Sequence, residues 1–260
     1  MNAWYALVEA LLPFTWAGPL FMRNALLAVL VVTPLLALMG TQVVNSRLAF
    51  FADSIGHSTL TGLALGVLCG FGQPLPVMAA FAAFFALLLA VVRRYSAAST
   101  DTIVGVFAST GIALGIVLLS RGGGFARYSA WLIGDLLSIT PTEIAAFAGL
   151  GLVILAAGAW FGNALLLCTV SPSLARSRGI RVWLIETTFI VLLAEVVAFA
   201  ASWVGILIIN ALLVLPAAAA RNLARGYPAY VAISLLSGLA TGVLGLVLAW
   251  YWDTAPSATI

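Results

Sequence analysis

A carboxylate and an imidazole stand four residues apart in a long apolar part of the sequence. Asp53 precedes His57, which is the only histidine among the 260 residues. On an α-helix this spacing is a rotation of about 40°, so both side chains project from one face, one turn apart. Carboxylate and imidazole are ligands that suit Zn²⁺ and Mn²⁺. The pair is therefore either a metal-handling site or an Asp–His contact that only holds helices together.

The depth expected for this pair favours a transient site. If the helix enters a bilayer near Leu48, His57 lies about 15 Å inside a hydrocarbon core of roughly 30 Å. An ionised aspartate at that depth costs about 2.5–3.5 kcal/mol, so it should face a cavity or a partner. Two ligands are too few for a structural zinc site, which needs four. The shortfall suits an ion that must leave again.

The composition predicts a polytopic membrane protein. Hydrophobic residues make up 64% of the sequence and charged residues 7%, whereas soluble domains are about one quarter charged. The apolar runs lack period-two alternation, which favours helices over a membrane β-barrel. We therefore expect an all-α fold with a single transmembrane domain over residues 1–260, in which residues 1–19 form an aromatic-rich interfacial segment.

About eight transmembrane helices are expected, since a span needs about 20 apolar residues. The predicted segments cover about residues 21–44, 48–71, 77–92, 99–119, 141–167, 182–203, 205–220 and 229–252. Between the fifth and the sixth segment, residues 171–181 form a short polar and basic connection.

The arginines fall unevenly on the two sides that these spans define. One side has Arg47, Arg93, Arg94, Arg176, Arg178, Arg181, Arg221 and Arg225. The other side has Arg23, Arg121 and Arg127. By the positive-inside rule the first side is cytoplasmic, which places residues 1–20, the 120–135 connection and the C-terminus outside.

All 11 basic residues of the chain are arginine, and it contains no lysine. A phosphate-binding P-loop needs its lysine, so the chain cannot hydrolyse ATP by that route. A Schiff-base lysine is excluded as well. The two cysteines, Cys69 and Cys168, form no CxxC motif and are interpreted as packing residues.

Further polar residues lie within or beside the predicted spans. Glu195 is inside the segment 182–203, where it can serve as a third metal ligand, a gate or a polar contact between helices. Glu186 is near the membrane boundary and close to Arg181 in sequence, so we expect an interfacial ion pair. Asn210 is a candidate for lining an ion path.

Small residues at helical spacing indicate close helix packing. Gly62 and Gly66, and likewise Gly111 and Gly115, form Gly-x-x-x-Gly pairs, which allow helix backbones to approach each other in lipid. We interpret these glycines and Pro216 as packing residues and not as ligands.

Four blocks of sequence, in order along the chain, resemble the permease subunits of zinc/manganese ABC importers. They are DSIGHS at 53–58 with GLALG at 62–66, DTIVG at 101–105 with ALG at 113–115, LIGDLL at 132–137, and VGIL at 204–207 with ALLVLPAAAAR at 211–221. Together they cover most of the chain from about residue 20 to 253. Each block is weak alone, and their shared order and spacing make the resemblance specific.

This resemblance implies roles for two groups of residues. Asp53 and His57 would belong to the coordination site of the transported ion in the pore. The connection 171–181 resembles the coupling segment that docks into the ATPase, although serines stand at 171 and 173 where the family usually has acids. The coupling residues would be Ser171, Pro172, Leu174, Ala175, Arg176, Arg178 and Gly179.

The resemblance also implies partners and a location. The chain would act as a homodimer in the bacterial cytoplasmic (inner) membrane, with a separate cytoplasmic ATP-binding subunit. An extracytoplasmic solute-binding protein would deliver the metal, Zn²⁺ in first place and otherwise Mn²⁺. The chain itself would be no enzyme, would hold no permanent cofactor and would bind no nucleic acid.

Three other functions remain open at this point. A permease for metal chelates such as siderophores or cobalamin needs a wide cavity, and the Asp–His pair would then be incidental. A proton-coupled secondary carrier would use Asp53, His57 and Glu195 as a proton relay. An intramembrane enzyme is disfavoured, because the chain has one histidine and no second metal-binding motif.

Overall fold

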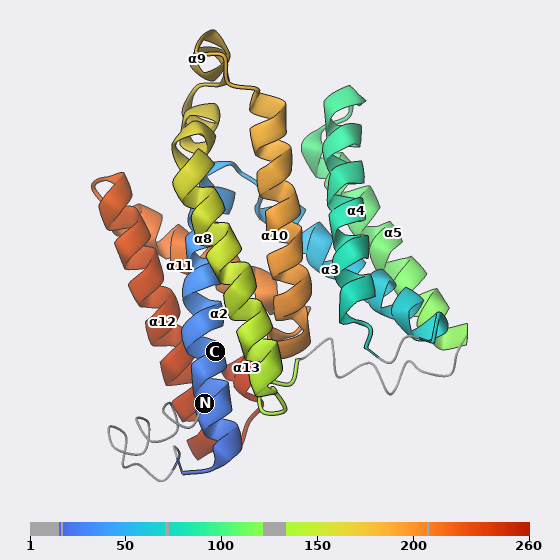
Figure 1. Ribbon diagram of the computed structural model, residues 1–260, viewed down its shortest axis with the longest axis vertical. Helices are drawn as coiled ribbons and strands as arrows, with labels where there is room; N and C mark the ends of the chain where they lie inside the picture. The colour runs from blue at the N-terminus through green and yellow to red at the C-terminus, as the bar shows by residue number, and fades with distance from the viewer. Residues whose placement is uncertain (1–15, 17, 71–72, 122–133, 207) are drawn as a thin grey trace.

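The computed structural model is helical wherever it describes regular structure, which confirms the all-α prediction (Figure 1). It describes residues 16, 18–70, 73–121, 134–206 and 208–260. Most of the predicted interfacial segment 1–19 and of the 120–135 connection lies outside these residues, as do positions 132, 133 and 207 of the sequence blocks. The helices that correspond to the eight predicted segments are α2 (Leu20–Asn45), α3 (Ala49–Leu68), α4 (Leu75–Tyr95), α5 (Thr100–Arg121), α8 (Pro141–Val170), α10 (Val182–Val204), α11 (Ile209–Leu223) and α12 (Tyr227–Trp252). Two shorter helices are α9 (Pro172–Ser177) and α13 (Pro256–Thr259).

Six of the described helices are long and apolar enough to cross a membrane, namely α2, α4, α5, α8, α10 and α12. The other two predicted spans differ from them for separate reasons. Helix α3 has 20 residues, but Asp53, His57 and several hydroxyl side chains lower its mean hydropathy. Helix α11 has only 15 residues, because Gly205, Ile206 and Ile208, which precede it, are not helical.

Local sequence explains where several helices begin and end. Helix α8 starts with a capping box, in which the Thr140 hydroxyl accepts from the Glu143 N–H at 3.4 Å and the Glu143 carboxylate accepts from the Thr140 N–H at 2.9 Å. Pro141 then occupies the first turn, where a missing N–H costs nothing. Helix α10 ends at Gly205, whose φ of 91° favours glycine over any residue with a side chain.

Among the six helices long and apolar enough to cross a membrane, α2 and α10 are the most buried. Hydrogen bonds join α2 to its neighbours: Gln42 donates to the Thr169 hydroxyl of α8 at 2.7 Å, and the Tyr230 hydroxyl of α12 donates to the Thr41 carbonyl at 3.1 Å. The Ser234 hydroxyl of α12 donates to the Ala37 carbonyl at 3.1 Å. These bonds pair polar groups that would be costly to leave unsatisfied in an apolar interior.

Helix α3 lies between two parts of the bundle. It packs most extensively against α5 and α4, and less extensively against α10 and α11. Figure 1 shows it tilted between the α4–α5 pair and α10. Asp53 and His57 are therefore carried by the helix that connects these two parts.

Arginines of α4 and α9 lie at the same end of the bundle. Helix α9 lies at one end, beyond the tips of α8 and α10, and the start of α2 lies toward the other end with α13 (Figure 1). Helix α4, whose last turn carries Arg93 and Arg94, ends on the α9 side. The chain order thus brings these arginines toward the same end as Arg176 of α9.

Glycines on α3 and α5 lie where neighbouring helices approach each other closely. A Cβ atom on Gly62 would lie 2.9 Å from Met78 Cα of α4, and one on Gly66 would lie 3.1 Å from Pro74 Cβ. A Cβ on Gly111 would lie 3.2 Å from Ser58 Cα, and one on Gly115 would lie 2.9 Å from Leu60 Cγ and 3.0 Å from the Thr61 nitrogen. Both glycine pairs therefore set the distance of α3 from its neighbours.

Pro216 is buried within α11. A Cβ on Gly238 of α12 would lie 3.9 Å from Pro216 Cβ. The proline ring thus faces the contact between α11 and α12.

Replacing Gly115 with alanine is expected to destabilise the protein by about 1–3 kcal/mol, because the added methyl meets α3 at less than contact distance. The matched control is Gly105→Ala on the same helix, where a Cβ would meet nothing within 4 Å. That change should be neutral or stabilising by about 0.5–1 kcal/mol. Thermal unfolding of both variants in detergent measures the difference, and equal midpoints would contradict the close α3–α5 contact.

Candidate functional site

The hydroxyl side chains around the Asp–His pair bond to the α3 backbone or to α5. The Ser58 hydroxyl donates to the Ile55 carbonyl at 2.7 Å, and the Thr59 hydroxyl donates to the Gly56 carbonyl at 2.5 Å. The Thr61 hydroxyl donates to the Gly111 carbonyl of α5 at 2.5 Å. All three residues are buried. These hydroxyl groups donate their hydrogen bonds to carbonyl groups within the bundle, which allows a polar stretch of helix to lie among apolar neighbours.

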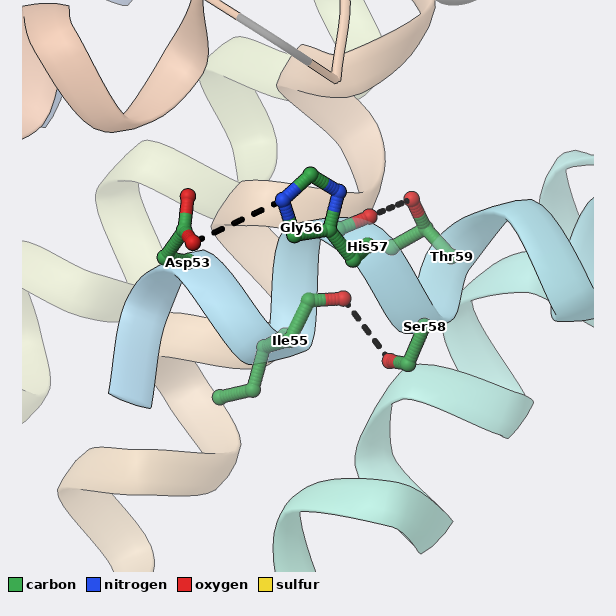
Figure 2. Close-up of polar contacts among 6 residues, drawn as sticks. All are labelled: Asp53, Ile55, Gly56, His57, Ser58 and Thr59. Atoms are coloured by element: carbon green, nitrogen blue, oxygen red, sulfur yellow. Dashed lines mark hydrogen bonds and ion pairs between the residues drawn. The ribbon is translucent and has the colours of Figure 1, made fainter. Parts of the chain in front are cut away.

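Asp53 and His57 lie on the same side of α3, as their spacing predicts. The Asp53 Oδ2 atom is 3.5 Å from the His57 Nε2 atom. Figure 2 shows both side chains on one side of the helix, and Ile55 and Ser58 on the opposite side. The contact lies within one helix, so it does not tie α3 to a second helix.

The face that carries the pair is open in the single chain. The side chain of Asp53 is 36% exposed and that of His57 is 21% exposed, whereas Ile55 between them is fully buried. A carboxylate exposed in this way cannot face lipid without a large cost. At the membrane depth that the sequence predicts for this pair, the open face would border a water-filled path or another protein surface.

One neighbour of this region is the start of α11. A Cβ on Gly56 would lie 3.7 Å from Ile209 Cγ2 and 3.7 Å from Val197 Cγ1 of α10. Asn210 follows Ile209, and its Oδ1 atom is buried without a hydrogen-bond partner among the described residues. The Ser54 hydroxyl on α3 is likewise buried and unpaired there. The sequence predicted Asn210 as a candidate and missed Ser54, whose only signal was its place beside Asp53 in an apolar helix.

Glu195 is partly buried on α10. No group of three or more His, Cys, Asp and Glu side chains in the described part of the chain is arranged to hold a metal ion. Asp53, His57 and Glu195 therefore do not form a three-ligand site within one copy of the chain in this structure. The ligand role of Glu195 stays a prediction.

The segment 171–181 contains the short helix α9. The Ser171 hydroxyl accepts from the Leu174 N–H at 3.4 Å and so caps the helix, as an acid at this position would. Ala175 is fully buried, whereas 45% of Leu174 is exposed. Gly179 has a φ of 76° and reverses the chain toward α10. The segment is thus an anchored turn at one end of the bundle (Figure 1), and its Leu174 side chain is exposed there.

Arg181 and Glu186 do not form the predicted ion pair. Both residues instead line a cavity between the end of α4, α9 and the start of α10. Sequence reasoning missed this cavity, since it assigned each arginine to a side of the membrane and not to a common site.

Comparison with known proteins gives a consistent set of similarities. A model of the ABC 3 transport family matches residues 20–260. The chain is 34% identical over 244 residues to the high-affinity zinc uptake system membrane protein ZnuB of Haemophilus influenzae, over 91% of this chain and 90% of that protein. It is 26% identical over 240 residues to the manganese import system permease protein ScaB of Streptococcus gordonii, over 92% of this chain and 86% of that protein. The solved structure of PsaBC from Streptococcus pneumoniae in complex with Fab matches with a TM-score of 0.83 and 25% identity, over 100% of this chain and 91% of that chain.

Proposed function

We propose a function that starts from the family of the chain. The chain belongs to the ABC 3 transport family, whose members include zinc and manganese importer permeases. As a member of this family it is a transport subunit and not an enzyme. Within the family, we assign it the passage of a divalent transition-metal ion across the bacterial cytoplasmic membrane. Zn²⁺ is the first expectation, because the similarity to the zinc uptake protein is higher than that to the manganese permease. Mn²⁺ is the second.

The observation that carries this proposal is the placement of Asp53 and His57. Both lie on one open face of an otherwise apolar helix, with 3.5 Å between Oδ2 and Nε2. A deprotonated carboxylate and a neutral imidazole on adjacent turns can bind one ion together. A purely structural pair would be expected to join two helices, and this one does not.

The proposed site is transient because it is incomplete. Two side chains leave at least two positions of a tetrahedral zinc ion open. Water, Glu195 or the same pair from a second copy of the chain would fill them. The unpaired Asn210 oxygen lies on the adjoining helix α11 and is a candidate for lining the path of the ion. Weak and changing coordination of this kind allows an ion to enter and leave.

Two features of the chain support the proposed partners. Because it lacks lysine and hence a P-loop, the chain does not hydrolyse ATP by that route, and we propose a separate ATPase as the energy source, with the exposed Leu174 on α9 as the docking contact. Because the Asp53 face is open, a second copy is proposed to cover it in a homodimer. A solute-binding protein outside the cell would deliver the ion.

The experiment that tests this function is reconstitution of the chain with its ATPase and binding protein in liposomes. We expect ATP-dependent uptake of ⁶⁵Zn, with weaker uptake of ⁵⁴Mn. Two other results would select a different function. Uptake that persists without the ATPase would indicate a proton-coupled carrier. Uptake of a metal chelate that is unchanged by Asp53→Ala would indicate a chelate permease.

A further inference from the structure

A cavity of about 870 Å³ opens between the end of α4, α9 and the start of α10. Four arginines line it, and the one acidic residue in its lining is Glu186. The arginines are Arg93 and Arg94 of α4, Arg176 of α9 and Arg181 at the start of α10. With four guanidinium groups against one carboxylate, the cavity carries an excess of three positive charges.

This positive charge is not neutralised within the described part of the chain. None of the four arginines forms an ion pair there, and Glu186 is in the lining without pairing with Arg181. Arg94 lies over the rings of Trp183 and Tyr95, at 4.9 Å and 5.5 Å from their centroids. The stacking orients one guanidinium. Of the other three, Arg93 and Arg181 lie outside the residues assigned to ATPase coupling and are available to an anion.

The wall of the cavity below the arginines is mostly apolar, with Thr187 as a polar lining residue. Ala90 and Ile190 are buried lining residues, and Leu184 is an exposed one. Ala90 is three residues before Arg93 and Ile190 is eight residues after the start of α10, so this wall extends about 5–12 Å from the charged rim into the predicted membrane. Tyr95 is 78% exposed and Trp183 is 38% exposed, which suits the headgroup level of a bilayer.

We propose that this cavity binds an anionic phospholipid of the cytoplasmic leaflet. Arg93 and Arg181 hold the phosphate, since guanidinium groups bind phosphate oxygens in a bidentate manner. Leu184, which is exposed, contacts the glycerol and the first part of an acyl chain. A soluble acidic partner would use the charged rim but not the apolar wall at membrane depth, and for this reason the cavity is assigned to a lipid.

Lipid titration of the full-length chain in detergent, followed by native mass spectrometry, tests this assignment. Phosphatidylglycerol should bind at least about tenfold more tightly than phosphatidylcholine. The double change Arg93→Gln/Arg181→Gln should weaken phosphatidylglycerol binding by about thirtyfold, because each basic residue near an anionic surface contributes about fivefold in affinity. Arg225→Gln, which changes an arginine outside the cavity lining, is the matched control and should bind as the unchanged protein does.

A variant that is expected to bind the lipid more tightly distinguishes an effect on lipid binding from an effect on folding. Glu186→Gln removes the one acid of the cavity lining and should strengthen phosphatidylglycerol binding several-fold, which a folding defect would not do.

Equal binding of the two lipids, or full phosphatidylglycerol binding by the double variant, would overturn the proposal. Displacement of the lipid by inorganic phosphate at the same concentration would also overturn it, since the site would then take a free anion. Loss of the ATPase from the double variant with lipid binding unchanged would assign the surface to that partner instead.

Discussion

His57→Ala is expected to lower ATP-dependent ⁶⁵Zn uptake by at least about tenfold to a hundredfold. Even an outer-shell partner of a metal ligand typically contributes that much, and His57 is proposed to touch the ion itself. The chain has no second histidine to take its place. The effect is therefore expected on both metals, although the loss should be larger for Zn²⁺, which prefers imidazole more than Mn²⁺ does. Initial uptake rates in liposomes, with equal amounts of folded protein, provide the measurement.

The matched control is Ser58→Ala on the same helix. The Ser58 hydroxyl bonds to the Ile55 carbonyl and lies on the side of α3 away from the pair (Figure 2). Its removal should leave uptake within about twofold of the unchanged rate, since only one intrahelical hydrogen bond is lost. If His57→Ala transported both metals as fast as Ser58→Ala, the pair would not be on the path of the ion.

Leu174→Asp is expected to abolish coupling to the ATPase without affecting the ion site. Leu174 is 45% exposed on α9, which lies beyond the tips of α8 and α10. A charge placed in an apolar docking contact typically costs about 2 kcal/mol or more of binding free energy, which is about thirtyfold in affinity. Uptake and co-purification of the ATPase should therefore fall together, while metal binding by the chain stays unchanged.

Ser173→Asp is the control for this change, because it adds the same charge one residue away. The corresponding position in the family usually carries an acid, so docking should be retained. Equal loss of ATPase binding in the two variants would show that charge near α9, and not the apolar contact of Leu174, determines the interaction. Full uptake by Leu174→Asp would show that α9 is not the docking element.

Most of the fold could be predicted from the sequence because the chain alternates long apolar runs with short polar connections. The i, i+4 spacing likewise predicted that Asp53 and His57 share a face, and their 3.5 Å contact agrees. The seventh span was less well predicted, since its helix begins at Ile209 and not at Gly205. Glycine at positive φ ends α10 there, and neither hydropathy nor periodicity registers such a break.

Features that depend on packing between helices could not be predicted. Arg181 and Glu186 are five residues apart, a spacing that does not bring side chains together on a helix as three or four residues do, and closeness in sequence was a poor guide to contact. The arginine-lined cavity joins residues from α4, α9 and α10. The unpaired Ser54 and Asn210 atoms depend on which groups the neighbouring helices bring near them. None of these has a pattern within a single segment.

The most direct test of the proposed ion site is zinc X-ray absorption of the full-length permease chain in detergent, purified without a histidine tag, without the ATPase and without the binding protein. Because His57 is the only histidine of the chain, any imidazole that the permease supplies to zinc must come from it. The unchanged chain should show imidazole scattering with a Zn–N distance of about 2.0–2.1 Å, and His57→Ala should lack it. Imidazole scattering that is absent from the unchanged chain, or is retained in His57→Ala, would contradict the proposed site.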